Sequence, residues 1–202
     1  MLKKLDYNFY NREDVVQIAR ELLGKILVTR MQEGFTSGRI VETEAYCGVT
    51  DRASHAYNGR RTARTEIMFN DAGRGYVYLC YGVHHLFNVV TNAKDIPHAI
   101  LIRAVEPLIG LDIMQRRTGK QQNDFSLTSG PGNLSRALGI ETRLSGIDLT
   151  GSTIYIAEDG YSISGNNIVA TTRVGVNYAG DDALLPYRFY VRGNGYVSAR
   201  KH

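Results

Sequence analysis

The chain has 202 residues, of which 43% are hydrophobic and 22% are charged, a balance typical of folded rather than disordered proteins. Its formal net charge of +4 at pH 7 slightly favours polyanionic partners and does not by itself indicate nucleic-acid binding. No apolar run approaches the roughly 20 residues that span a bilayer, and the first ten residues lack a signal-type apolar stretch. We therefore expect a cytoplasmic protein without membrane contact. Cys47 and Cys80 lack zinc-type spacing, so no metal site is expected.

The first 46 residues predict one helix followed by two strands. Asn11 is the expected N-cap of the helix, Asp14 would complete the cap three residues on, and Gly24 would close the C-terminal end. The residues 26–30 and 39–46 then have the composition and alternation of strands. The buried stripe of the helix would consist of four residues at helical spacing: Val15, Ile18, Ala19 and Leu22.

A long irregular segment and a hairpin come next. Residues 48–75 show no periodicity, and a loop of that length in a compact protein is usually functional or disordered. The segments 76–81 and 83–91 are predicted to pair as a hairpin with Gly82 near its tip. Residues 99–105 form a further apolar strand.

The C-terminal half mixes both kinds of element. A helix is predicted from Pro107, a polar mobile segment at 116–127, a short helix opening at 129–132, and strands beyond residue 152. Because helices and strands do not alternate regularly, the sequence predicts an α+β fold rather than a doubly wound sheet. No linker divides the chain, so residues 1–202 are expected to form a single domain.

Two carboxylates and an arginine are the candidate catalytic groups. Strand alternation puts Glu42, Glu44 and Tyr46 on one face. Such carboxylates are usually solvated, but the apolar flanks and the nearby ring favour a partly dry pocket, where a carboxylate can act as a general base on water. Glu42 could instead pair with an arginine. Arg103 lies in an apolar strand and needs an acid from the strand 39–46; a plain buried salt bridge and a fork that holds a carboxylate and a water are equally compatible.

Aromatic and basic residues suggest a nucleic-acid surface. Tyr78 and Tyr81 belong to the predicted hairpin, and a ring at its tip would bury nothing in the monomer but could enter a base stack. Arg60 and Arg64 flank Thr62 in the irregular segment. A charge run is usually a solvated face, but beside a stacking pocket these side chains would suit backbone phosphates.

The stretches RIVETEAY, YVYLCYG, LIRAVEPL, SGPGNL, RVGV and RFYVRG, in this order, resemble the alkyladenine (3-methyladenine) DNA glycosylase family. The resemblance extends from about Ile40 to Ser198. It implies a compact single α+β domain with a mixed antiparallel curved sheet, flanking helices and a protruding β-hairpin. It also implies that the protein needs no metal or cofactor. The expected partner is double-stranded DNA containing damaged purines, and the expected state is a monomer.

The resemblance also implies roles for individual residues. Glu44 matches the general base that activates water, and Arg103 matches the arginine that helps to position it. Tyr81 matches the ring inserted into the duplex. Four residues match those that enclose the extruded base: Tyr46, His55, Tyr78 and Asn88. The residues 83–87 depart from the more apolar pattern of familiar relatives, which leaves the base selectivity open.

These features predict a monofunctional glycosylase. Water would break the N-glycosidic bond, and the products would be a free base and an abasic site. Since no lysine accompanies the pocket residues, neither a Schiff base nor strand cleavage is expected. The rival interpretations are a non-catalytic module that recognises distorted duplex and a protein–protein or ribosome-associated domain. The range of lesions, from 3-methyladenine to hypoxanthine, ethenoadenine and 7-methylguanine, stays open.

Overall fold

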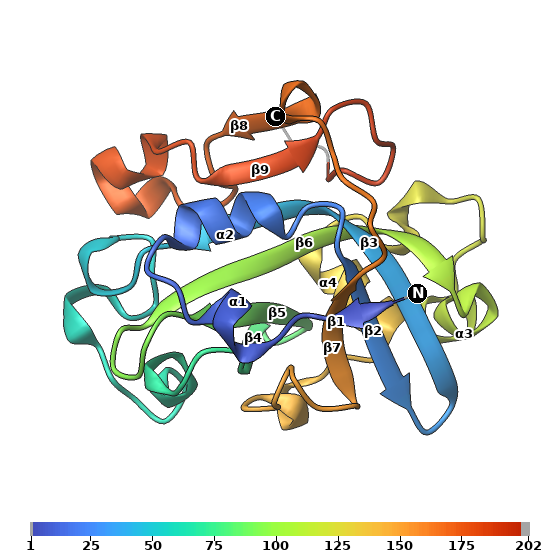
Figure 1. Ribbon diagram of the computed structural model, residues 1–202, viewed down its shortest axis with the longest axis horizontal. Coiled ribbons are helices and arrows are strands. Elements are labelled where there is room, and N and C mark those ends of the chain that lie inside the picture. The colour runs from blue at the N-terminus through green and yellow to red at the C-terminus, as the bar shows by residue number, and fades with distance from the viewer. Residues whose placement is uncertain (1, 199–202) are drawn as a thin grey trace.

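The computed structural model describes residues 2–198, and it shows an α+β fold built on one nine-stranded sheet (Figure 1). The order of the strands is β1-β7-β2-β3-β6-β5-β4, and β9 joins β3 and carries β8. Every pairing between these strands is antiparallel. The strands are β1 (Lys3–Lys4), β2 (Ile26–Met31), β3 (Gly34–Tyr46), β4 (Gly75–Cys80), β5 (His84–Thr91), β6 (His98–Ile109), β7 (Ile154–Glu158), β8 (Ile168–Thr171) and β9 (Arg188–Val191). The helices are α1 (Tyr7–Tyr10), α2 (Val15–Glu21), α3 (Leu111–Thr118) and α4 (Pro131–Leu138).

Strand β3 is the axis of the sheet and changes partner halfway along its length. Its first half pairs with β2, whereas Glu42, Thr43 and Glu44 pair with β9 on the same side. The register against β6 shifts between Ile40 and Glu42 and again before Thr43. Such bulges bend a strand and increase its twist, which fits the transfer of β3 from β2 to β9. The carboxylates of β3 therefore lie where three strands meet.

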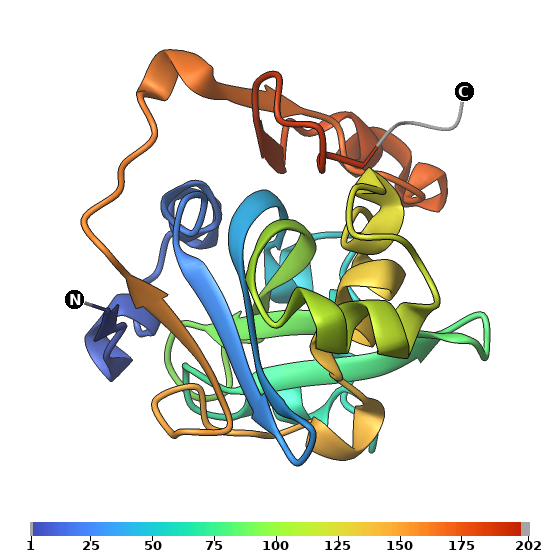
Figure 2. The same ribbon diagram turned by 90° about the vertical axis from the view of Figure 1, so that its right-hand side faces the viewer.

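Helices and loops cover both sides of this axis. Helix α2 packs on β3 and β6, while α3 and α4 pack on each other and on β3, β5 and β6. Figure 2 shows α2 and the α3–α4 pair on either side of β3. The segment that carries β8 and β9 passes over α2, as Figure 1 shows. It brings residues 171–184 to the same side as the hairpin of β4 and β5.

The hairpin projects from the body of the protein. Its tip is visible at the right of Figure 2, on the side opposite the N-terminus. Tyr81 and Gly82 form the turn with φ values of 50° and 70°, in the left-handed region that a glycine adopts freely and a tyrosine rarely does. Tyr81 is 91% exposed, so the predicted position of this ring at a protruding tip is confirmed.

Two sequence predictions about helix starts are wrong. The N-cap of α2 is Asp14, whose side chain accepts from Gln17 N, and Asn11 instead ends α1. No helix starts at Pro107, because β6 continues to Ile109 and α3 begins only after Gly110. At that point β6 pairs with β3 alone, since β5 pairs only with residues 98–101. A strand with one free edge tolerates a proline, which has no N–H to donate.

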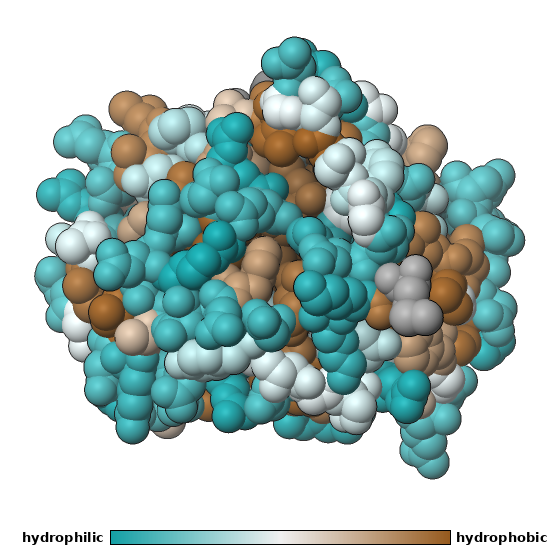
Figure 3. All heavy atoms as spheres, in the orientation of Figure 1, coloured by the Kyte–Doolittle hydropathy of each residue, from teal (hydrophilic) through white to brown (hydrophobic). Residues whose placement is uncertain are grey.

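Two further predictions concern irregular segments. Apart from Gly75, which begins β4, the regular elements within residues 48–75 are three short 3-10 helices, so the predicted lack of regular structure is confirmed. The segment 116–127 is partly helical, because α3 runs on to Thr118 and a 3-10 turn covers Phe125–Leu127. On the face shown in Figure 3, away from the hairpin, hydrophilic side chains predominate around smaller apolar patches. Within residues 2–198, no helix combines the length and the apolar character that crossing a bilayer requires.

Candidate active site

A cleft of about 620 Å³ opens at the base of the hairpin. Its walls come from β4 and β5, from the loop 53–64, from the start of α4 and from the loop 174–178. Cavities of this size hold small ligands in many proteins. The lining side chains include Tyr46, His55, Arg64, Tyr76, Tyr78, Tyr81, Asn88, Arg103 and Tyr178. The folded chain thus brings together residues that are up to 132 positions apart in sequence, from Tyr46 to Tyr178.

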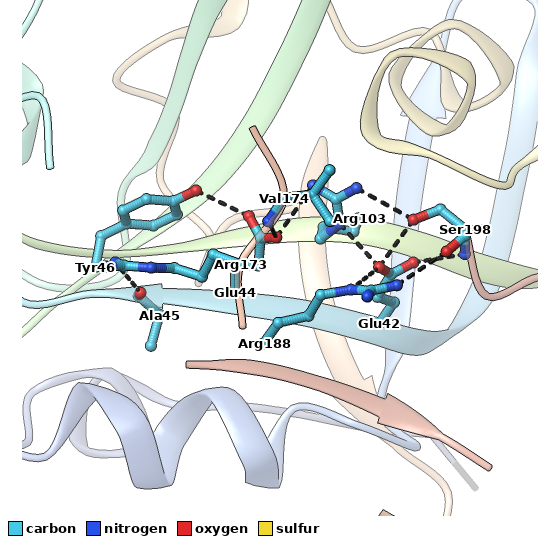
Figure 4. Close-up of polar contacts among 9 residues, drawn as sticks. All are labelled: Glu42, Glu44, Ala45, Tyr46, Arg103, Arg173, Val174, Arg188 and Ser198. Atoms are coloured by element: carbon cyan, nitrogen blue, oxygen red, sulfur yellow. Dashed lines mark hydrogen bonds and ion pairs between the residues drawn. The ribbon is translucent and has the colours of Figure 1, made fainter. Parts of the chain in front are cut away.

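Glu44 lies directly behind this cleft and has no exposed surface. Three groups hold its carboxylate, as Figure 4 shows. The Tyr46 hydroxyl donates to Oε2 at 2.8 Å, and the backbone N–H of Val174 donates to Oε1 at 2.7 Å. Arg103 Nη1 lies 3.3 Å from Oε1. A buried carboxylate needs such partners because an unpaired buried charge is costly. Tyr46, Val174 and Arg103 all line the cleft, so the carboxylate borders it.

Arg103 joins the two carboxylates of β3, where the sequence had predicted an acid partner from that strand. Its Nε donates to Glu42 Oε1 at 2.8 Å, and the Nε of Arg188 donates to the same oxygen at 2.6 Å. The backbone N–H of Ser198 donates to Glu42 Oε2 at 2.7 Å. Burial alone would raise the pKa of Glu42, but Arg103, Arg188 and Ser198 outweigh burial and hold the pKa below its ordinary value. Glu42 therefore anchors the arginines, whereas Glu44 contacts three residues that line the cleft.

Three aromatic rings form the apolar wall of the cleft. Tyr76 and Tyr78 are stacked with their ring centroids 5.5 Å apart. The imidazole of His55 meets Tyr78 edge-on at 4.6 Å, and its Nδ1 lies 2.9 Å from the Tyr76 hydroxyl. Burial, followed by the positive charges of Arg64 and Arg60, lowers the pKa of His55 to about 4. His55 is therefore neutral at physiological pH and can offer one ring nitrogen to a ligand.

Asn88 lies on the floor of the cleft and is almost fully buried. Its Nδ2 donates to the carbonyl of Tyr76 at 3.1 Å and lies 3.4 Å from that of Leu86. Because both contacts use the amide nitrogen, the carbonyl oxygen Oδ1 is the atom that this side chain can turn to a ligand.

The basic loop divides into paired and unpaired arginines. Arg61 donates to Glu66 at 2.6 Å and to Asp95 at 2.7 Å, which neutralises its charge on the surface. Arg60 is exposed and forms no ion pair within residues 2–198. The guanidinium of Arg64 lies 5.5 Å from the centroid of the Tyr78 ring and lines the cleft. Thr62 is exposed and caps the turn to Thr65.

Several residues of the site escaped the sequence reasoning. Val174 supplies its backbone N–H, which a side-chain motif cannot reveal. Arg173 and Asp51 form an ion pair that is fully buried beside Tyr46. Tyr178, 70% exposed at the cleft mouth, donates from its hydroxyl to the carbonyl of Ala53. An arginine among apolar residues in the stretch VATTRVGV was the one available signal, since such a side chain needs a buried acid.

A metal site does not emerge from the described part of the chain. Between residues 2 and 198, no three His, Cys, Asp or Glu side chains converge in a way that could hold a metal ion. The chemistry that the observed groups can perform is acid–base work by Glu44 on a water, beside a flat pocket of aromatic rings.

Comparisons with known proteins identify the family of this chain. A profile described as "Methylpurine-DNA glycosylase (MPG)" matches residues 8–195. A protein of Desulfitobacterium hafniense named "Putative 3-methyladenine DNA glycosylase" is 45% identical over 98% of this chain and 100% of its own length. Proteins of the same name from Bacillus licheniformis and Methanocella arvoryzae are 47% and 44% identical, over 96% and 97% of this chain and 96% of each relative. The chain therefore belongs to the methylpurine-DNA glycosylase family.

Proposed function

We propose that this protein is a monofunctional DNA glycosylase of the 3-methyladenine type, which extrudes damaged purines from duplex DNA and hydrolyses their N-glycosidic bonds. The observation that carries the proposal is the position of Glu44, a fully buried carboxylate that borders an aromatic cleft and is held by three donors. A buried and oriented carboxylate of this kind is suited to act as a general base.

The reaction would take place at the sugar of the extruded nucleotide. Oε1 of Glu44 is shared by Val174 and Arg103, whereas Oε2 accepts one hydrogen bond, from Tyr46, and retains a lone pair for a water. As the bond between C1′ and the purine nitrogen breaks, the electron pair leaves with the base and positive charge develops on the sugar. Glu44 stabilises that charge and takes a proton from the attacking water, whose oxygen bonds to C1′. Arg103, fixed by Glu42, keeps the carboxylate in place and helps to position the water.

The cleft would hold the base. Tyr46 and Tyr78 offer ring faces for stacking, His55 offers a hydrogen-bonding edge, and Asn88 meets the far side of the purine. Such rings also attract a positively charged alkylated base through cation–π contact. Hydrolysis without strand cleavage is favoured because no lysine is among the residues that line the cleft in the described chain.

Duplex DNA would lie across the hairpin and the loop 53–64. Tyr81 would enter the base stack and fill the gap left by the extruded nucleotide. Arg60, Thr62 and Arg64 are exposed and would contact backbone phosphates, with Arg64 reaching the cleft as well. We also propose that the chain acts as a single domain, since all nine strands share one sheet, and that it acts as a monomer.

The test is release of free purines from methylated duplex DNA. Wild type should release 3-methyladenine, and Glu44→Gln should release none while its affinity for lesion-containing DNA is retained, because the amide keeps the shape but cannot act as the base. Glu33→Gln is the matched control, since Glu33 is exposed and pairs with Arg117 away from the cleft. A folded wild type that binds DNA and releases nothing would support a non-catalytic module instead. Excision by Glu44→Gln at the wild-type rate would remove Glu44 as the base.

A further inference from the structure

Arg173 is a buried cation beside the site and lies outside the cleft wall. It is 4% exposed, and its partner Asp51 is 3% exposed. Both guanidinium Nη atoms contact the Asp51 carboxylate, with Nη2 at 2.9 Å from Oδ1. The guanidinium carbon lies 4.8 Å from the ring centroid of Tyr46 and 5.4 Å from that of Tyr187. The group is thus fixed in every direction by a bidentate pair and by two rings.

Arg173 is connected to Glu44 in two ways, through the backbone of β3 and through the next residue in its own loop. Its Nη1 donates to the carbonyl of Ala45 at 2.9 Å, between Glu44 and Tyr46 on β3. The next residue, Val174, supplies the N–H that holds Glu44 Oε1. Figure 4 shows Arg173 alongside Tyr46 with its guanidinium at the Ala45 carbonyl. Arg173 is therefore one residue from one donor to Glu44 and in contact with the ring of the other.

Asp51 extends the same network to the opposite wall of the cleft. Its carboxylate accepts from the backbone N–H groups of Cys47 and Ala53, each at 3.0 Å. These bonds fix the turn that leads from β3 into the loop of His55. The single ion pair therefore ties together β3, the His55 loop and the loop 173–178.

Fold stability alone gives no reason for charges at this position. Apolar side chains of similar volume often replace a buried ion pair without loss of stability, because desolvation of the charges offsets their attraction. In addition, the Nε of Arg173 has no hydrogen-bond partner within the described chain, which adds a cost to its burial. What the pair does provide is a fixed distance between the donors and the carboxylate of Glu44.

We propose that Arg173 and Asp51 are positioning residues for the catalytic base, holding the Val174 N–H and the Tyr46 ring against the two oxygens of Glu44. This inference rests on the proposed function. Loss of the pair would let the loop 173–178 and the Tyr46 hydroxyl shift slightly against Glu44, while the rings of Tyr76 and Tyr78 on β4 stay in place to hold the base. Small displacements of a catalytic group are enough to slow a reaction about 100-fold.

The test compares single-turnover excision rates with half-saturating enzyme concentrations on duplex DNA that contains one lesion. Arg173→Gln and Arg173→Lys should lower the maximal rate about 100-fold and change the half-saturating concentration less than about threefold. Lysine should not rescue, because a compact ammonium cannot form the bidentate contact. Since Arg173→Gln leaves Asp51 unpaired, the double variant Asp51→Asn/Arg173→Gln removes both charges and should show the same loss in rate.

Arg39 provides a control with the same kinds of contact at a less buried position. It also forms a bidentate pair, with Asp159, stacks on a ring, Tyr161, at 4.3 Å and donates to a backbone carbonyl, that of Gly24. None of these residues lines the cleft. Arg39→Gln should therefore lower the melting temperature without changing the excision rate, which separates positioning from general stability.

Three outcomes would overturn the inference while the wild type excises normally. The first is a folded Arg173 variant, judged by circular dichroism, with the wild-type maximal rate. The second is a loss confined to the half-saturating concentration, which would indicate a role in binding. The third is failure of all three variants to fold at any temperature, which would make the pair structural. A wild type that releases no purine would instead refute the proposed function itself.

Discussion

The hydroxyl of Tyr46 lies 2.8 Å from Glu44 Oε2, two residues away on the same strand. Strand alternation puts both side chains on one face, so a ring that can stack on a base also binds the carboxylate that would activate the attacking water. Burial, and then the negative charge of Glu44, raise the pKa of the Tyr46 phenol well above its usual value. The hydroxyl is therefore a permanent donor at physiological pH.

This hydrogen bond predicts that Tyr46→Phe slows excision but leaves the stacking of the base intact. The ring remains, but one hydrogen bond to a buried carboxylate is lost, and bonds to charged groups contribute about 1.5–3 kcal/mol. Single-turnover excision should therefore fall roughly 10- to 100-fold, while affinity for lesion DNA changes little. Tyr155→Phe, on β7 outside the cleft, is the control. An unchanged excision rate in Tyr46→Phe would contradict a role for the hydroxyl in holding Glu44.

The lowered pKa of His55 predicts a pH dependence of stability. The folded protein holds this pKa at about 4, whereas the ordinary value is 6.5, so the unfolded chain alone takes up a proton between these values. The free energy of unfolding should therefore rise from pH 4 to pH 6.5 and level off above, with a contribution of about 3 kcal/mol from His55. Urea denaturation of wild type and His55→Gln at several pH values measures it.

The variant should lose that part of the slope, and His84→Gln, at an exposed histidine, should keep it. If wild type and His55→Gln show parallel pH profiles from 4 to 6.5, the imidazole is not held neutral in the folded protein. In that case, the cleft would carry an extra positive charge under mildly acidic conditions, and the rings would stack less well on a cationic base.

The sequence predicted those parts of the site that depend on one strand or on one residue's need for a partner. Glu44 and Tyr46 share a strand, and an arginine in the apolar run around Arg103 had to find an acid, so their meeting could be anticipated. The family resemblance, and not periodicity, supplied the roles of His55 and Asn88. Their geometry around the cleft now makes those roles physically plausible, but the roles stay predictions.

The rest of the site depends on contacts between distant segments. Val174 is 130 residues from Glu44, and long-range contacts such as the pairing of β9 with β3 bring its loop to the site. Almost any residue type can donate a backbone N–H, so the sequence does not reveal which residue does so. The helix predicted from Pro107 was wrong because a local preference was overridden. Proline favours a helix start, but β6 has a free edge at that point and can include it. In such cases strand pairing, and not local propensity, decides the secondary structure.

Ion pairing in the basic loop predicts which arginine contacts phosphate. Arg60 is free of ion pairs in the described chain, so Arg60→Gln should weaken DNA binding at low salt and reduce the slope of log K against log salt by about one. Arg61 already pairs with Glu66 and Asp95, so Arg61→Gln should leave the slope nearly unchanged. Titrations of duplex DNA at several salt concentrations measure both. Equal slopes for the two variants would contradict this division.

The backbone of Tyr81 predicts an unusual separation of stability from activity. With φ of 50° and a ring that is 91% exposed, the residue contributes no packing to the fold, and glycine would relieve about 1 kcal/mol of strain. Tyr81→Gly should therefore match or exceed the wild type in melting temperature. Its excision from intact duplex should nevertheless fall, because no side chain fills the gap that the extruded base leaves in the stack.

A fluorescent base analogue at the lesion should show less unstacking with Tyr81→Gly. The control Phe125→Ala, at an exposed aromatic residue outside the cleft, should unstack the analogue as the wild type does. Unstacking by Tyr81→Gly at the wild-type level would remove the wedge role, because the extruded state would then be held by the cleft alone.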